Sequence, residues 1–193
     1  EKLKEEYPNV KMDVVDTKSG SLASGLIAFQ GAKLSEIGAS FEEIIKISKE
    51  NIQNIEHVFT IDNLNWLLKG GRINRSGAII GSALNIKPIL DVQKGKMVVI
   101  EKIRGRKRAL ATVANIAQER VKEFPNQIIG ITHADDINAA LDVKEMISKK
   151  IGHDNIFVEK IGSVLGSHLG IGGVGVFFFN KKSGLYINEF KTT

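Results

Sequence analysis

The spacing of apolar residues along the chain alternates between the two-residue period of strands and the 3.6-residue period of amphipathic helices. Strands are predicted at residues 10–15, 55–61, 86–92, 97–102, 127–133, 156–161 and 174–179. Helices are predicted at residues 21–37, from residue 41 onward, and at 63–68, 76–84, 106–124 and 137–151. Strands that alternate with helices of this length are typical of an α/β fold with at least some parallel strand pairs.

Capping and turn residues mark several boundaries of these elements. Ser40 and Glu43 have the spacing of a capping box, and Gly38 suits the end of the preceding helix. Lys94-Gly95 predicts a tight turn between two strands. The first six residues read as the end of a helix, and we expect residues of the natural protein to precede Glu1.

A loop rich in hydroxyl groups, residues 16–21, connects the first predicted strand to the first long helix. Ligands of α/β folds bind beside the carboxyl ends of strands, so such a loop is a candidate for the lining of a site. A hydroxyl before a helix also caps its first turn. For Ser19 and Ser21, capping is the favoured interpretation.

The segment Gly70-Gly71-Arg72 follows a short predicted helix and precedes an apolar helical pattern. Two glycines let the backbone approach a ligand, a helix start adds free N–H groups, and Arg72 supplies a forked charge for a carboxylate or phosphate. The competing interpretation is a pair of helix-ending glycines followed by a surface arginine. Both interpretations stay open on the sequence alone.

A second glycine-rich segment, residues 162–175, contains the spacing G-x-G-x-x-G. A dinucleotide site requires a helix after these glycines, whereas an apolar strand follows here, so this function is not predicted. His168 lies in this segment, which we predict to be a loop, and is the best candidate for a titrating side chain. His57, His133 and His153 have less convincing contexts.

Composition excludes several classes of function. The chain has 193 residues, of which 42% are apolar and 25% charged, as in ordinary packed domains. It has no cysteine, which excludes disulfides and thiol catalysis and fits a cytoplasmic location. No apolar run approaches the ~20 residues of a membrane span. No histidine pair has metal-ligand spacing, so we predict no metal site and no cofactor.

The net charge of +5 is densest at Arg104–Arg108. A nucleic-acid site would add aromatic residues or a wide basic face, and no aromatic residue lies in this cluster. We therefore expect no nucleic-acid partner. A solvated helix start and a surface that docks another protein remain the two interpretations.

Several motifs, in the same order along the chain, resemble those of the DegV family. They are Asp16-Thr17, Asp62-Asn63-Leu64, residues 69–73, residues 81–90, residues 104–109, His133-Ala134 and the glycine-rich segment that ends in Gly-Val-Phe-Phe. The resemblance covers nearly all of the chain up to about Lys181.

The resemblance implies mixed and parallel sheets flanked by helices in two lobes. Residues 1–70 would be the remainder of the first lobe, 71–182 the second lobe and 183–193 a tail. It further implies a non-catalytic protein that binds one long-chain fatty acid in a buried tunnel. A separate fatty-acid kinase would phosphorylate the carboxylate from ATP, and the acyl-phosphate would feed phospholipid synthesis.

By motif match, the resemblance places Arg72 and His168 near the fatty-acid head group, with Ser21 as an additional candidate. It places Arg104 and Arg106 in a basic stretch that docks the acidic kinase, which favours the docking interpretation of that cluster. Contact with a membrane surface would be transient. The competing hypothesis is an enzyme acting on a phosphorylated small molecule, with Arg72 holding phosphate and His168 as general acid or base.

Family motifs that carry head-group hydroxyls are absent from this chain. They are an opening strand with Asp-Ser-Thr, a Thr-Ser-Gln-Pro segment and a Leu-Ser-Gly-Thr segment. We therefore expect most of the first lobe, and about half of the head-group site, to be missing here. The tail, with Tyr186 and Phe190, is expected to be a further strand or disordered.

Overall fold

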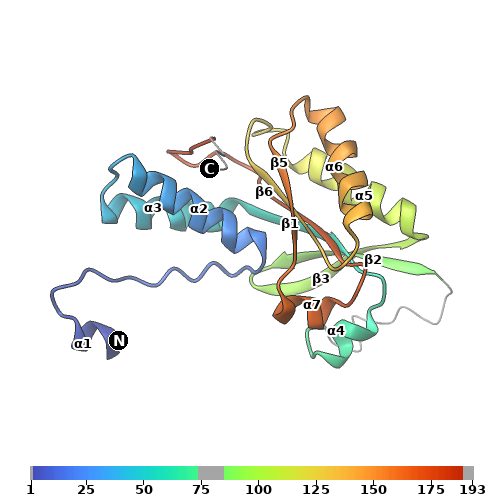
Figure 1. Ribbon diagram of the computed structural model, residues 1–193, viewed down its shortest axis with the longest axis horizontal. Coiled ribbons are helices and arrows are strands. Elements are labelled where there is room, and N and C mark those ends of the chain that lie inside the picture. Colours follow the sequence, from blue (N-terminus) through green and yellow to red (C-terminus); the bar gives the residue numbers. More distant parts are fainter. Residues whose placement is uncertain (1, 74–84, 189–193) are drawn as a thin grey trace.

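A computed structural model describes residues 2–73 and 85–188 and shows a six-stranded sheet (Figure 1). The strands are β1 (Ile55–Thr60), β2 (Ile86–Gln93), β3 (Lys96–Arg104), β4 (Ile129–His133), β5 (Ile156–Lys160) and β6 (Val174–Phe179). Their order is β3-β2-β1-β6-β4-β5, in which β4 and β5 pair in parallel and the other neighbours pair antiparallel. The predicted α/β class with a mixed sheet is confirmed.

Helices cover the two faces of this sheet unequally. They are α1 (Lys2–Glu6), α2 (Leu22–Glu36), α3 (Phe41–Asn54), α4 (Asn65–Lys69), α5 (Arg106–Arg120), α6 (Ile137–Ile151) and α7 (Ser163–Leu169). The first face is covered by α5 and α6, whereas α2 packs on the second face against β4 and β6, with α3 beside it. The short helices α4 and α7 pack on each other near β1 and β2.

The core is organised around β6, in which all six residues are buried. Side chains alternate between the two faces of a strand. Val176 and Phe178 therefore join the core under α5 and α6, and Phe177 and Phe179 join the core under α2. An apolar strand without polar alternation is typical of a strand covered on both faces, and β6 was predicted with the bounds observed.

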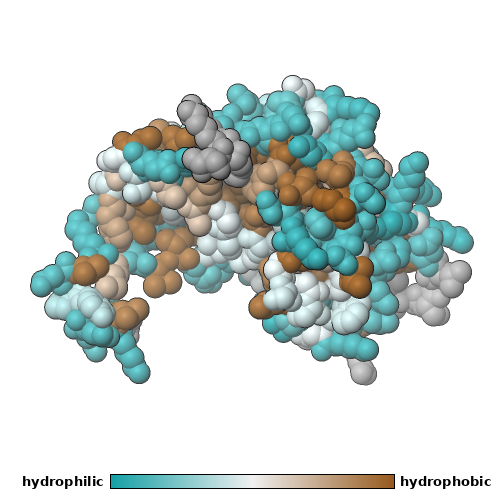
Figure 2. Space-filling model, in the orientation of Figure 1, coloured by the Kyte–Doolittle hydropathy of each residue, from teal (hydrophilic) through white to brown (hydrophobic). Residues whose placement is uncertain are grey.

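Two predicted elements differ from the structure. Residues 10–15 form no strand but part of an exposed arm that carries α1, and Figure 2 shows this arm reaching away from the rest of the molecule. A strand requires a neighbour for its backbone hydrogen bonds, and this segment has none within the described chain. Helix α5 ends at Arg120, before Pro125, which disfavours a helical residue in front of it. The predicted helix at 76–84 lies outside the described residues.

The described part of the tail, residues 183–188, is neither a strand nor disordered. The Tyr186 ring packs edge-on against Phe124 and Phe179, and its hydroxyl accepts a hydrogen bond of 2.9 Å from the Ile128 N–H. Burial raises the pKa of Tyr186 to about 12. The buried Gln30 amide exchanges two hydrogen bonds with the Ile187 backbone. Side chains therefore hold this segment against α2.

The start of α3 has the capping interactions that the sequence predicts. The Ser40 side chain accepts from the Glu43 N–H, and the Glu43 carboxylate accepts from the Ser40 N–H, so the capping box is confirmed. Gly38 has a φ of 84° after α2, as expected for a glycine that ends a helix. Across residues 2–73 and 85–188, no helix combines the length and apolar character needed to cross a membrane.

The predicted division between residues 1–70 and 71–182 stays a prediction. In the sheet, β1 lies between β2 and β6 and pairs with both. Backbone hydrogen bonds therefore connect the segment before residue 70 to the two segments that follow it.

Substitution of Gly130 tests how closely α2 approaches the sheet. A Cβ at Gly130 would lie 2.9 Å from Leu22 Cδ1, 3.2 Å from Leu22 Cβ and 3.3 Å from Phe157 Cζ, so Gly130→Ala forces Leu22 and Phe157 to shift. We expect the free energy of unfolding to fall by about 1–3 kcal/mol in chemical denaturation. Gly162→Ala is the control, because its Cβ would meet nothing within 4 Å. Equal stabilities of the two variants would contradict this packing.

Candidate functional site

The Gly70–Arg72 loop is the end of α4, built as a helix-ending turn. The Gly71 N–H donates to Leu68 O at 3.1 Å and the Arg72 N–H donates to Leu67 O at 2.9 Å, the paired pattern of a Schellman motif. Gly71 has a φ of 67°, a conformation that glycine adopts without the Cβ penalty. The capping interpretation is thus confirmed. The same turn leaves Arg72 exposed, with its Nη1 donating to Gly70 O at 2.7 Å.

His168 lies against this loop, although it belongs to α7 and not to the predicted loop. A Cβ built on Gly70 would lie 2.6 Å from His168 Nδ1, so only glycine leaves room for the imidazole at this position. In the same way, Trp66 of α4 packs against Gly170, the residue that follows α7. A Cβ built on Gly170 would lie 2.4 Å from Trp66 Cδ1. The glycines of both predicted motifs therefore let α4 and α7 pack closely, and this packing brings His168 to the Arg72 loop.

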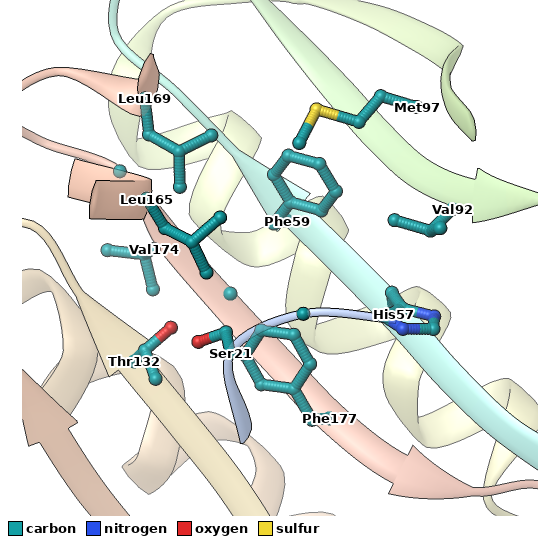
Figure 3. A pocket seen from close by; sticks show the side chains of 13 residues that line it. Ser21, His57, Phe59, Val92, Met97, Thr132, Leu165, Leu169, Val174 and Phe177 are labelled. Carbon is teal, nitrogen blue, oxygen red and sulfur yellow. The ribbon is translucent and has the colours of Figure 1, made fainter. Parts of the chain in front are cut away.

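An apolar cavity of about 60 Å³ lies between the start of α2, α7 and the second face of the sheet (Figure 3). Its wall is mainly apolar and includes Phe59, Val92, Met97, Leu165, Leu169 and Phe177. A shallower depression beside it contains Arg72 and Gly71 together with Lys18 and Lys96. The two hollows share Gly20, Val92, Met97 and Leu165 as wall residues. Asp16 also lines the depression and pairs with Lys18, so Arg72 and Lys96 supply the net positive charge beside the apolar interior.

Ser21 lies on the wall of the cavity at the start of α2. Its side chain makes no capping hydrogen bond, and its φ of 56° is uncommon for a residue with a side chain. The Ser19 hydroxyl does not cap the helix either, because it is bonded to His57 Nε2 at 2.9 Å. The favoured sequence interpretation, that Ser19 or Ser21 caps α2, is therefore wrong.

His57 lies on the wall of the cavity, although its place in a predicted strand did not indicate a functional role. It is 4% exposed, its Nε2 is bonded to Ser19, and its Nδ1 has no hydrogen-bond partner within the described chain. Burial lowers the pKa of His57 from 6.5 to about 4, and the charge of Asp91 opposes this shift only in part. The imidazole is therefore neutral near pH 7. His57 and Phe59 are two residues apart in β1, so they lie on the same face of the strand. This spacing is the sequence feature that could have predicted His57 beside an apolar wall.

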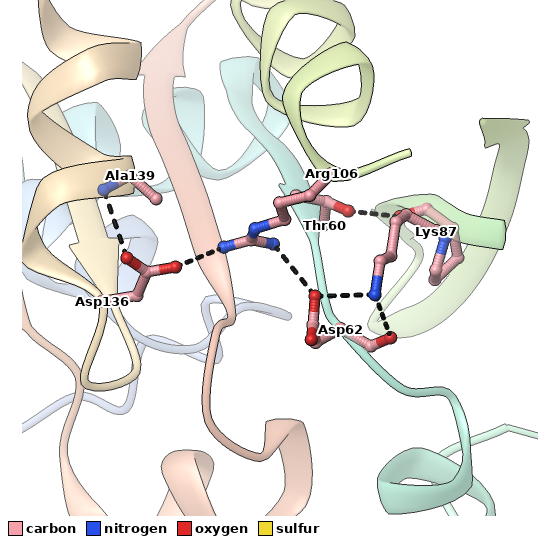
Figure 4. A network of polar contacts seen from close by, with 7 residues as sticks. Thr60, Asp62, Lys87, Arg106, Asp136 and Ala139 are labelled. Carbon is pink, nitrogen blue, oxygen red and sulfur yellow. Dashed lines mark hydrogen bonds and ion pairs between the residues drawn. The ribbon is translucent and has the colours of Figure 1, made fainter. Parts of the chain in front are cut away.

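Arg104 and Arg106 of the basic cluster have different surroundings, and Figure 4 shows those of Arg106. Arg104 is exposed at the end of β3. The Arg106 guanidinium instead lies between two carboxylates, 2.9 Å from Asp136 Oδ2 and 3.9 Å from Asp62 Oδ1. Lys87 binds Asp62 at 2.8 Å. Arg106 is thus ion-paired within the protein, which the interpretation of a fully solvated helix start did not predict.

The five residues predicted from motifs are not all brought together. Arg72 and His168 meet at the Gly70–Arg72 loop, and Ser21 lies across the shared wall in the adjoining cavity. Arg104 and Arg106 line neither of these two hollows. Among the described residues, no group of three or more His, Asp or Glu side chains could hold a metal ion.

Comparison with known sequences connects this arrangement to one family. A family model matches residues 1–181 of this chain, and its description is "Uncharacterised protein, DegV family". A DegV domain-containing protein of Clostridium perfringens is 38% identical over 179 residues, which cover 92% of this chain and 62% of that protein. Protein DegV of Bacillus subtilis is 33% identical over 169 residues, covering 87% and 59% respectively. The chain therefore spans less than two thirds of the length of these relatives.

Solved structures share the fold. A fatty acid binding DegV family protein from Streptococcus agalactiae superposes with a TM-score of 0.81 at 33% identity, over 94% of this chain and 64% of that one. DegV of Bacillus subtilis, described as a fatty acid binding protein, has a TM-score of 0.72 at 32% identity, over 86% and 59%. A DegV family protein from Ruminococcus gnavus, refined with vaccenic acid, has a TM-score of 0.80 at 27% identity, over 91% and 63%.

Titration of His57 tests the burial of the cavity wall. Its folded pKa of about 4 lies below 6.5, so the unfolded chain takes up the proton first as the pH falls. The contribution of His57 to the free energy of unfolding is therefore complete above pH 6.5 and is lost between pH 6.5 and 4, by roughly 3 kcal/mol. NMR of the imidazole should show no titration of His57 above pH 5. A midpoint between pH 6 and 7 would show that the ring is solvated.

Proposed function

Because the chain belongs to the DegV family, we propose that it binds a long-chain fatty acid, with the acyl chain in the apolar cavity and the carboxylate near Arg72. The observation that carries this proposal is the wall shared by the Arg72 depression and the apolar cavity. A ligand that is charged at one end and apolar along its length fits such a pair of hollows. The relatives from Streptococcus agalactiae and Bacillus subtilis are described as fatty acid binding proteins, which supports the same ligand class.

The cavity is too small to enclose a whole long-chain fatty acid. Pockets for small molecules usually enclose ~300–1,000 Å³, whereas this cavity encloses about 60 Å³. In the proposal, this cavity receives one section of the acyl chain, and the rest of the ligand lies beyond it. The chain spans less than two thirds of its relatives, so the activity of the whole protein is proposed here and not read from these residues alone.

Arg72 and His168 have distinct roles in this proposal. A guanidinium forms charge-assisted hydrogen bonds with a carboxylate or an acyl-phosphate. His168 packs against Gly70, so it supports the loop that carries Arg72 and places an imidazole at the same end of the site. Ser21 lies on the cavity wall, where it contacts the acyl section of the ligand. The apolar wall favours an acyl chain over the phosphorylated small molecule of the competing enzyme hypothesis.

We further propose that the protein acts without catalysis of its own and presents the carboxylate to a separate ATP-dependent kinase. The product would be an acyl-phosphate for phospholipid synthesis in the cytoplasm. Arg104 is the better candidate for contact with an acidic kinase surface, because it is exposed. Arg106 is already ion-paired with Asp136 and lies 3.9 Å from Asp62, so its charge is less available to a partner.

Substitution of Arg72 tests the position of the head group. We expect Arg72→Gln to weaken the binding of palmitate or oleate by roughly 10- to 100-fold, since a hydrogen bond to a charged group is lost. Binding would be measured by competition with a fluorescent fatty acid, and bound lipid by extraction and mass spectrometry. The control is Arg108→Gln, at an exposed arginine of α5. The proposal fails if the unsubstituted protein carries and binds no fatty acid.

Charge reversal at Arg104 tests the kinase contact. Arg104→Glu should lower the rate of acyl-phosphate formation by at least about tenfold with the fatty-acid kinase of the same organism, while fatty-acid affinity stays unchanged. Acyl-phosphate would be trapped with hydroxylamine. Lys107→Glu is the matched control, at an exposed residue of the same cluster. Equal loss in both variants would indicate a general effect of charge and not a contact at Arg104.

A further inference from the structure

The cavity contains polar groups that its proposed apolar ligand does not use. Ser21, His57 and Thr132 all line it, and their neighbours on the wall are mainly apolar. Within the described chain, no hydrogen bond is made by the hydroxyls of Ser21 and Thr132 or by His57 Nδ1. Buried polar groups are ordinarily hydrogen-bonded. His57 and Thr132 are buried and Ser21 is half-buried, so the presence of their unused polar atoms on one cavity wall requires an explanation.

Thr132 is more deeply buried than Ser21. It is 4% exposed in β4, on the strand side opposite to Ile129 and Ile131, which join the core under α5 and α6. Its partner in the adjacent strand is Gly175, which has no side chain to cover the hydroxyl. The Thr132 hydroxyl therefore faces the cavity with no hydrogen-bond partner among residues 2–73 and 85–188.

Ser21 approaches the same point from α2. Figure 3 shows the hydroxyl oxygens of Ser21 and Thr132 pointing toward one another at one end of the cavity, with His57 at the other end. The Ser21 φ of 56° puts this side chain on the cavity wall and not over the first turn of α2, where it would cap the helix. Two facing hydroxyls can donate to and accept from a single oxygen placed between them.

We propose that this cavity recognises a hydroxyl group on the acyl chain, so that the ligand class is a hydroxylated long-chain fatty acid. This inference rests on the proposed function and specifies its substrate. A straight hydrocarbon section would leave Ser21 and Thr132 unpaired, whereas a hydroxyl in the acyl chain bonds to both. Sites built to hydrogen-bond a substrate hydroxyl discriminate against the analogue that lacks it, because their buried polar groups are then left without partners.

The test compares stearate with a series of hydroxystearates that carry the hydroxyl at successive positions along the chain. Competition binding with the full chain should show at least one hydroxystearate binding roughly fivefold to tenfold more tightly than stearate. Thr132→Val, which replaces the hydroxyl by a methyl group of similar volume, should abolish this preference. Thr132→Ser should retain it. Ser21→Ala should reduce it.

The matched control is Thr112→Val, at a residue of α5 whose exposed hydroxyl bonds Arg108 O and lies outside the cavity. Thermal denaturation of each variant establishes that it is folded. If stearate binds as tightly as every hydroxystearate, or if Thr132→Val keeps the preference, the inference is wrong and water occupies the polar end of the cavity. If no fatty acid of either kind binds, the proposed function itself is wrong.

Discussion

Within residues 2–73 and 85–188, the helices cover the second face of the sheet incompletely, and the candidate site lies in the gap that they leave. α2 covers the part formed by β4 and β6, and the α4–α7 pair covers the end of β1 and β2. Side chains of a strand alternate between faces, so His57 and Phe59 of β1 must point toward the gap between these helices. The apolar wall around this gap is only partly covered by protein, and an apolar ligand would complete its burial.

Close contacts at glycine connect this gap to the depression that contains Arg72. Gly70 makes room for His168, and Gly170 makes room for Trp66, so α4 and α7 approach more closely than larger residues would allow. The Schellman turn at the end of α4 then places Arg72 beside the apolar cavity. Helix capping and ligand binding are therefore not competing interpretations of Gly70–Arg72, because the cap is the means by which Arg72 is positioned.

A network of ion pairs connects the segments that follow β1 and β4. Arg106 connects Asp62, which follows β1, to Asp136, which caps α6, and Lys87 of β2 joins at Asp62 (Figure 4). A guanidinium that is half-buried between two carboxylates stabilises chain segments that are distant in sequence. Arg104 and Arg106 are two residues apart, yet one faces solvent and the other is neutralised within the protein.

The sequence by itself determined the elements whose signals are local. These include β6 with its unbroken apolar run, α6 with its helical period, the capping box at Ser40, and the motifs that identify the family. Only the tertiary structure decided that residues 10–15 pair with no strand of the described chain and that the Ser21 hydroxyl does not cap α2. It likewise decided that His57 is buried and neutral and that Arg106 is ion-paired. The physical reason is the same in each case: pairing, burial and charge compensation depend on neighbours that lie far away along the chain.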